Sequence, residues 1–140
     1  MYLITLAVAE EEGRTAPLPL ADLAQRLDIS PVSANQMVRR LEERGLVDYH
    51  PYHGAALTPE GRVAARRVLR GRRLWATFLA EHLAFTPQEA DSLACSLEHV
   101  TPPEAADRLA RFLGNPAVGP LGRPIPPTSR AAATGPGARP

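Results

Sequence analysis

The stretch that decides the fold is residues 20–41, LADLAQRLDISPVSANQMVRRL. Apolar residues recur at helical spacing from Leu20 to Leu27 and predict one short helix. Ser30 is a good N-cap and Pro31 a good first helical residue, so a second helix is expected to start after about three residues. Two short helices with so tight a connection indicate a helix-turn-helix.

The second helix of this pair presents a polar face that suits DNA. Asn and Gln side chains can pair with adenine edges, and Arg with guanine or phosphate. Helix pairs of this kind are also common packing units that bind nothing, so the neighbouring sequence has to decide. The predicted DNA-binding residues are Ser30, Val32, Ser33, Asn35, Gln36, Arg39 and Arg40.

The chain beyond this pair favours DNA binding. Residues 46–49 and 55–57 are short strand-like runs around the turn-rich tip from Pro51 to Gly54, which predicts a β-hairpin. A hairpin in this place is the wing of a winged helix-turn-helix. From Arg39 to Arg73 there are nine arginines against four acids, an excess that suits a nucleic-acid partner.

Helices are predicted on both sides of this region. One covers residues 1–12, and a second starts at Thr58-Pro59-Glu60 and runs to about Leu83, changing from arginine-rich to apolar along its length. Two S/T-x-x-E capping boxes, at Thr86 and Thr101, predict helices over 87–100 and 102–113.

The expected fold is therefore mainly α, with two domains. Residues 1–64 form the winged helix-turn-helix DNA-binding domain, residues 65–126 form a helical domain, and residues 127–140, rich in Pro, Gly and Ala, form a disordered tail. Three helices make a small core, which favours pairing of the second domain with a second subunit. A single cysteine, no signal peptide and no apolar stretch of about 20 residues predict a cytoplasmic protein without a membrane partner.

Cys95, Glu98 and His99 stand at i, i+3 and i+4 of the helix expected over 87–100. At 100° per residue they point away from the apolar side of that helix, toward solvent or the other domain. A thiol, a carboxylate and an imidazole on one face can each bind a divalent metal. A lone cysteine is more often a small buried apolar residue, and a Glu-His pair is usually solvated.

From Met1 to about Pro126 the chain resembles the diphtheria toxin repressor family of metal-dependent transcription regulators. This resemblance implies a winged helix, a helical dimerisation domain and repression switched on by Fe(II) or Mn(II), in the two-domain form that lacks the SH3-like domain of some members. The segments that carry it are Met1-Tyr2-Leu3 with residues 10–13, residues 23–27 with Ser30-Pro31, residues 41–47, residues 57–62, residues 94–95 with 97–100, and residues 122–126.

The resemblance also implies a site. The family's primary regulatory metal site falls on Met1, Cys95, Glu98 and His99. A cysteine at the second position is typical of iron-responsive members, and thiolate with imidazole suits Fe(II) better than Mn(II). We expect Fe(II) as the effector, with Mn(II) as the second candidate and Co(II), Ni(II) or Zn(II) as substitutes in vitro.

The family's ancillary metal site is expected to be lost. Its two histidines and its glutamate fall on Arg72, Asp91 and Ala76, and a guanidinium cannot bind a metal. We expect one metal per subunit, and an Arg72–Asp91 ion pair that holds the two helices in place of the second metal.

Three functions follow. The first is a homodimeric, metal-activated repressor that binds a double-stranded DNA operator and controls metal homeostasis. The second is a winged-helix regulator that has lost metal control. The third is an enzyme with Cys95 as nucleophile and His99 as base. No oxyanion-hole loop or orienting group for the histidine accompanies that pair, so we predict that the protein is not an enzyme.

Overall fold

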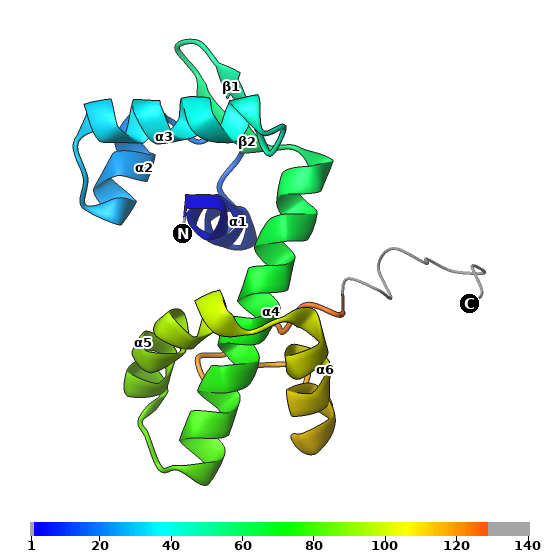
Figure 1. Ribbon diagram of the computed structural model, residues 1–140. Helices are drawn as coiled ribbons and strands as arrows, with labels where there is room; N and C mark the ends of the chain where they lie inside the picture. The colour runs from blue at the N-terminus through cyan, green and yellow to red at the C-terminus, as the bar shows by residue number, and fades with distance from the viewer. Residues whose placement is uncertain (1, 129–140) are drawn as a thin grey trace, which may run out of the picture. The chain divides into compact units, whose positions relative to one another are not determined.

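The computed structural model describes residues 2–128 of the 140-residue chain. The predicted mainly helical fold, with a hairpin after the helix-turn-helix, is confirmed (Figure 1). None of the helices in this part of the chain is long and apolar enough to cross a membrane. The elements are α1 (Tyr2–Glu11), α2 (Leu20–Leu27), α3 (Pro31–Glu43), β1 (Val47–His50), β2 (Gly54–Leu57), α4 (Pro59–His82), α5 (Pro87–Leu97), the 3-10 turn η1 (Glu98–Val100) and α6 (Pro103–Phe112).

The chain divides into two compact units, unit 1 (Met1–Ala65) and unit 2 (Arg66–Pro140). The division falls inside α4, in its arginine-rich part and before the apolar part that starts at Leu74. Met1 and residues 129–140, which make up most of the predicted tail, lie outside the described residues.

In unit 1 the helix-turn-helix forms as its local signals predict. α2 ends at Asp28, which takes a left-handed conformation with φ of 54°. The Ser30 hydroxyl then accepts a hydrogen bond from the Ser33 backbone N–H at 3.1 Å and caps α3. The buried side of the pair is Leu23, Ala24, Ala34, Val38 and Leu41.

The hairpin follows α3 directly. β1 and β2 pair antiparallel, from Val47 opposite Leu57 to His50 opposite Gly54. The segment before α2 adds a short bridge to the outer edge of β2, because Leu18 and Ala55 exchange backbone hydrogen bonds of 2.8 and 2.9 Å. The chain therefore returns to the hairpin from a position more than 30 residues earlier, a pairing that no local pattern predicts.

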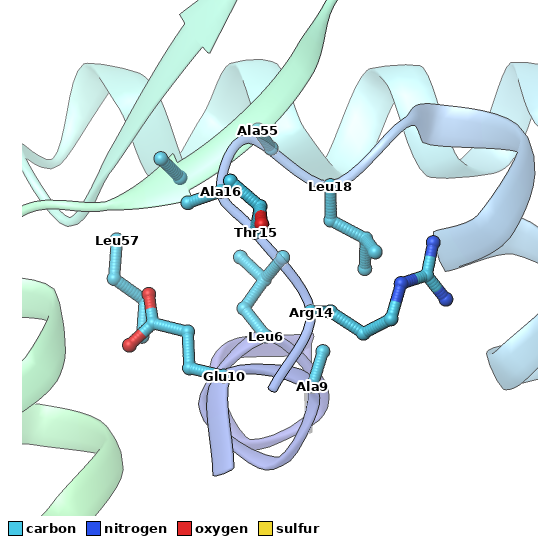
Figure 2. A pocket seen from close by; sticks show the side chains of 10 residues that line it. Leu6, Ala9, Glu10, Arg14, Thr15, Ala16, Leu18, Ala55 and Leu57 are labelled. Carbon is cyan, nitrogen blue, oxygen red and sulfur yellow. The ribbon is translucent and has the colours of Figure 1, made fainter. Parts of the chain in front are cut away.

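The bridge leaves a small pocket where α1, the segment 14–18 and β2 meet (Figure 2). Leu6 and Ala9 of α1, Leu18, and Ala55 and Leu57 of β2 line it with apolar side chains. These side chains are all buried, so the pocket is part of the packing between α1 and the hairpin.

α4 starts with a Thr cap, as predicted. The Thr58 hydroxyl accepts from the Gly61 N–H at 3.0 Å and donates to the Gly45 carbonyl at 2.7 Å. The guanidinium of Arg62, one residue further, makes two 3.1 Å hydrogen bonds to the Glu10 carboxylate of α1. The first turn of α4 is thereby tied both to the end of α3 and to α1.

Unit 2 is built around the C-terminal part of α4, with α5 and α6 packed against it (Figure 1). Two clusters of small residues let these helices approach closely: Ala76, Leu79, Ala90 and Ala94 with α5, and Leu74, Ala106 and Ala110 with α6. The segment after α6 is held by two arginines of α4. Arg73 donates to the Pro124 carbonyl at 2.7 Å, and Arg70 donates to the Pro126 carbonyl and to Asp107, both at 3.0 Å.

Two details of the predicted helices are wrong. α5 ends at Leu97, and residues 98–100 form a 3-10 turn instead of continuing the α-helix. The capping box at Thr101 is absent, since α6 is preceded by Pro102 and has no side-chain cap. The Thr101 hydroxyl is already used, because it donates to the Leu97 carbonyl at 2.6 Å and accepts from the Trp75 indole at 2.8 Å.

The two glycines of α4 give a test of this packing. A Cβ on Gly61 would lie 1.9 Å from the Leu46 carbonyl oxygen, whereas a Cβ on Gly71 would meet nothing closer than 3.7 Å. We expect Gly61→Ala to lower the free energy of unfolding by about 1–3 kcal/mol through overpacking. The matched control Gly71→Ala is expected to raise it by about 0.5–1 kcal/mol, the gain for Ala over Gly in a helix. Denaturant unfolding of both variants measures this, and equal effects would contradict it.

The cap of α5 predicts a pH dependence. The capping box at Thr86 is complete, because its hydroxyl accepts from the Glu89 N–H at 3.2 Å and its own N–H donates to the Glu89 carboxylate at 3.0 Å. The hydrogen bond from the Thr86 backbone N–H, with a smaller contribution from the Thr86 side chain, lowers the pKa of the Glu89 carboxyl. The stabilisation is therefore present above the unfolded-state pKa and is lost as pH falls through the lowered folded-state pKa.

Glu89→Gln keeps an oxygen acceptor without the charge. We expect the difference in Tm between the wild type and this variant to be largest near neutral pH and to disappear in strong acid. Thermal unfolding across this pH range measures the difference, and a constant difference would refute the assignment.

Candidate metal centre and nucleic-acid interface

The first candidate site is the outer face of α3 in unit 1. The structure places all seven predicted DNA-binding residues on this helix or at its cap. Six of them are exposed, with Val32 at 68%, and Asn35 is half-buried. The Ser30 hydroxyl is engaged in the cap, where it also donates to the Ser33 hydroxyl at 3.0 Å. The face that remains open to a DNA groove is mostly polar and positively charged.

Arg39 contacts the hairpin as well as lying on the exposed face of α3, and the sequence did not predict this contact. Its guanidinium lies 4.8 Å from the centre of the Tyr49 ring on β1, a cation–π arrangement. Glu42, one helical turn further, accepts from the Tyr49 backbone N–H at 3.2 Å. α3 and the hairpin are thereby joined into one rigid surface.

The second candidate site is the end of α5 in unit 2, where Cys95, Glu98 and His99 lie. Glu98 begins the 3-10 turn, and its side chain is completely buried while the His99 side chain is 56% exposed. Of the three residues, Glu98 is therefore the one that does not face solvent.

The buried Glu98 carboxylate is the unusual feature of this site. Within the described residues neither of its oxygens accepts a hydrogen bond. Among the described residues, the nearest basic groups are the His99 imidazole at 3.7 Å and the Arg72 guanidinium at 4.0 Å. Burial raises the pKa of the Glu98 carboxyl, although the charges of Arg72 and His99 partly offset this. A buried acceptor without a donor requires an explanation, and a bound cation is one that fits a carboxylate.

Arg72 and Asp91 form the ion pair expected at the two ancillary positions. The guanidinium donates two hydrogen bonds to the carboxylate, at 3.2 and 2.9 Å, between α4 and α5. Both side chains are largely covered, with 21% and 30% exposure. Burial lowers the pKa of Arg72, but the hydrogen bonds and charge of Asp91, with smaller contributions from Cys95 and Glu98, outweigh it and leave the pKa raised.

The predicted ligands fit a divalent metal by chemistry more than by arrangement. Glu98 offers an unpaired carboxylate, His99 an exposed imidazole close to it, and Cys95 a free, half-buried thiol on the preceding turn. Among residues 2–128 no three His, Cys, Asp or Glu side chains already converge on one point. Met1, the fourth predicted ligand, lies outside the described residues.

Comparison with known proteins follows the same division of the chain. Residues 1–55 match the model described as "Iron dependent repressor, N-terminal DNA binding domain". Residues 58–127 match the model described as "Iron dependent repressor, metal binding and dimerisation domain". The chain belongs to the iron-dependent repressor family. This confirms the resemblance seen in the sequence, and the family is one of transcriptional repressors and not of enzymes, as predicted.

One relative is the iron-dependent repressor IdeR of Mycobacterium tuberculosis, which is 39% identical to this chain over 126 residues. Those residues are 90% of this chain and 54% of IdeR. The chain spans about half the length of the curated relatives it matches. A solved structure of the manganese regulator SloR is similar with a TM-score of 0.79 and 30% identity, over 91% of this chain and 59% of that one. The solved structure of a manganese-dependent transcriptional repressor in complex with manganese is similar with a TM-score of 0.81 and 35% identity. The match covers 90% of this chain and 57% of that one.

Thr101 has a role at this site that its predicted use as a helix cap did not include. Its hydroxyl links the Leu97 carbonyl, at the end of α5, to the Trp75 indole of α4. It therefore stabilises the 3-10 turn that buries Glu98. The signal available in the sequence was the spacing from Leu97 to Thr101, since a threonine hydroxyl can bond the carbonyl four residues earlier.

A double-mutant cycle tests the Arg72–Asp91 pair. We expect a coupling energy of about 1 kcal/mol for a bidentate pair that is partly covered. Arg72→Gln alone should destabilise more than Asp91→Asn, because it also removes the permanent positive charge that lies 4.0 Å from the buried Glu98 carboxylate. Denaturant unfolding of the two single variants and the double variant gives the coupling. Additive effects of the two substitutions would show that the pair contributes nothing.

Proposed function

We propose that this chain is a homodimeric DNA-binding repressor of metal homeostasis, activated by Fe(II), with one regulatory metal site per subunit. DNA binding is assigned to residues 1–64, and dimerisation and metal binding to residues 65–126. The proposed ligands are Cys95, Glu98 and His99, with Met1 as a fourth donor that rests on the family resemblance alone. The operator is double-stranded DNA, read by the exposed face of α3.

The single observation that carries this proposal is the buried carboxylate of Glu98, to which no group among residues 2–128 donates a hydrogen bond. An ionised carboxylate in an apolar surrounding is unfavourable unless a cation compensates it. Arg72 supports it only from 4.0 Å and already makes two shorter hydrogen bonds to Asp91. A divalent cation at Glu98 would supply the missing charge, with the imidazole of His99 and the thiol of Cys95 as its neighbouring donors.

The choice of Fe(II) over Mn(II) rests on Cys95. Thiolate is a soft ligand that suits Fe(II), Co(II), Ni(II) and Zn(II) better than Mn(II), which prefers oxygen ligands. The relatives are divided, since IdeR is named iron-dependent and SloR is named a manganese regulator. In this chain the donor set of one thiol, one carboxylate and one imidazole favours iron.

One metal per subunit is proposed because Arg72 and Asp91 already connect α4 to α5 without a metal. Their two hydrogen bonds join the helices at the ancillary positions, and the guanidinium brings a fixed positive charge. A second divalent cation beside that charge would be repelled. We propose that the ion pair performs the structural part of the second metal's role.

Dimerisation is proposed through unit 2, whose surface carries large apolar side chains. Leu83, Leu93 and Phe112 are 54%, 41% and 65% exposed. Phe112 packs at a tilt against the rings of Phe78 and His82 and extends an aromatic surface from α4 to α6. The matching family model is described as a dimerisation domain, so a second copy of this chain is the partner that this surface fits.

The second candidate is a winged-helix regulator that no longer responds to metal. The Arg72–Asp91 pair favours it, because these helices hold together without any ion. The two candidates differ in a measurable quantity, the ratio of DNA affinities with and without Fe(II).

Glu98→Gln tests the proposal, with Glu104→Gln as the control because that glutamate is exposed and lies in the same unit. At Fe(II) concentrations about 100-fold above Kd, the metal should stabilise the wild type by about 2.7 kcal/mol. We expect Glu98→Gln and Cys95→Ser to remain folded dimers but to lose both this stabilisation and the Fe(II)-dependent DNA binding. Glu104→Gln should keep both properties.

The measurements are anaerobic thermal unfolding, metal content per subunit and binding to a duplex enriched from a random library by the Fe(II)-loaded wild type. Wild-type DNA affinity that is equal with Fe(II) and with chelator would exclude metal activation and leave the second candidate. Two ions per subunit would contradict the one-site proposal.

A further inference from the structure

The 3-10 turn that carries Glu98 and His99 is followed by two prolines. Pro102 and Pro103 have no backbone N–H, so neither residue can add a hydrogen bond that holds the end of the turn. Thr101, between the turn and the prolines, takes an extended conformation with φ of −105° and ψ of 102°, as is usual before proline. Holding this end of the turn in place is therefore left to side chains.

The side chain of Thr101 contacts both neighbouring helices. Its hydroxyl donates to the Leu97 carbonyl at 2.6 Å and accepts from the Trp75 indole N–H at 2.8 Å. Its methyl group lies over the backbone of Gly71, where an added Cβ would meet it at 3.7 Å. Gly71 and Trp75 are four residues apart and share one face of α4. Thr101 therefore connects the end of α5 to that face of α4.

Trp75 is a fixed partner for this threonine. Its ring meets the Phe78 ring edge-on, with the ring centroids 5.9 Å apart and the planes at 88°. Together with Leu97 it also packs against the buried cluster that joins α4 to α5. Because the indole is held by this packing, its hydrogen bond fixes the position of Thr101 relative to α4.

The two candidate metal ligands of the turn lie between these fixed points. Glu98 and His99 stand between Leu97 and Thr101 in the chain, and Arg72 of α4 lies 4.0 Å from the Glu98 carboxylate. The distances between a metal and its ligands vary by only about 0.2 Å in well-formed sites. A backbone that carries two ligands therefore has to be held in place if the site is to bind tightly.

We propose that Thr101 and Trp75 are positioning residues for the metal ligands Glu98 and His99, and that their hydrogen bond sets the metal affinity of the site. Neither side chain is itself a ligand, because the Thr101 hydroxyl is engaged with Leu97 and Trp75 and the indole nitrogen is only a donor. Residues that orient metal ligands through hydrogen bonds contribute about 10- to 100-fold in affinity. This inference rests on the proposed metal-binding function and adds to it the residues that hold the ligands.

Three variants test the pair, each titrated with Co(II) in competition with a chelating dye. Thr101→Val keeps a methyl group over Gly71 and loses both hydrogen bonds, so its affinity for Co(II) should fall about 10-fold or more. Trp75→Phe keeps an aromatic ring and loses only the hydrogen bond to Thr101, and it should also bind more weakly than the wild type. Thr101→Ser, which keeps the hydroxyl, should bind nearly as tightly as the wild type.

Thr77→Val is the matched control. Thr77 is buried in α4, and its hydroxyl donates to the Arg73 carbonyl four residues earlier at 2.8 Å, the same kind of bond that Thr101 makes to Leu97. We expect this variant to have a lower Tm but to bind Co(II) like the wild type. The absorption spectrum of bound Co(II) is a second readout, since it depends on coordination geometry and ligand type. It should change in Thr101→Val and stay unchanged in Thr77→Val.

Wild-type Co(II) affinity in Thr101→Val, or an equal loss of affinity in Thr77→Val, would overturn the inference. If Thr101→Val does not fold, the affinity of Trp75→Phe compared with that of Thr77→Val decides in the same way. A wild-type chain that binds no Co(II) would instead refute the proposed metal site itself, so the two failures are distinguishable.

Discussion

The burial of one carboxylate constrains most of unit 2. Glu98 is taken out of water at the end of α5 without a hydrogen-bond donor among the described residues. A charge in such a place is tolerated only when positive groups stand close enough to compensate it. Arg72, on the neighbouring helix, and His99, on the same turn, are those groups, and their positions depend in turn on the packing of α4 against α5.

Arg72 connects two carboxylates of different character. Asp91 receives two direct hydrogen bonds and is partly open to solvent, whereas Glu98 receives only the longer-range field of the same guanidinium. Arg72 therefore neutralises the Asp91 carboxylate directly, whereas the charge of the buried Glu98 carboxylate is only partly compensated. In this chain the difference separates the acid that joins α4 to α5 from the acid that we propose as a metal ligand.

Features that depend on neighbouring residues could be predicted from the sequence, and features that depend on distant residues could not. Ser30-Pro31 at the start of α3 and Thr86 with Glu89 at the start of α5 are short-range signals, and both gave the observed caps. Thr101 shows the same local pattern as Thr86, yet it failed as a cap because a tryptophan 26 residues earlier occupies its hydroxyl. The surroundings of Glu98 were not predictable from its own turn for a related reason. Arg72, whose guanidinium lies 4.0 Å from the Glu98 carboxylate, stands 26 residues earlier in the chain.

The hydrogen bond between Trp75 and Thr101 has a practical consequence. Trp75 is the only tryptophan of the chain, and its indole N–H is bound to the hydroxyl that closes the turn carrying Glu98 and His99. Indole emission is sensitive to hydrogen bonding and to the polarity around the ring. The protein therefore contains an intrinsic fluorophore at its candidate metal centre, and a rearrangement of the 3-10 turn can be followed optically without any added label.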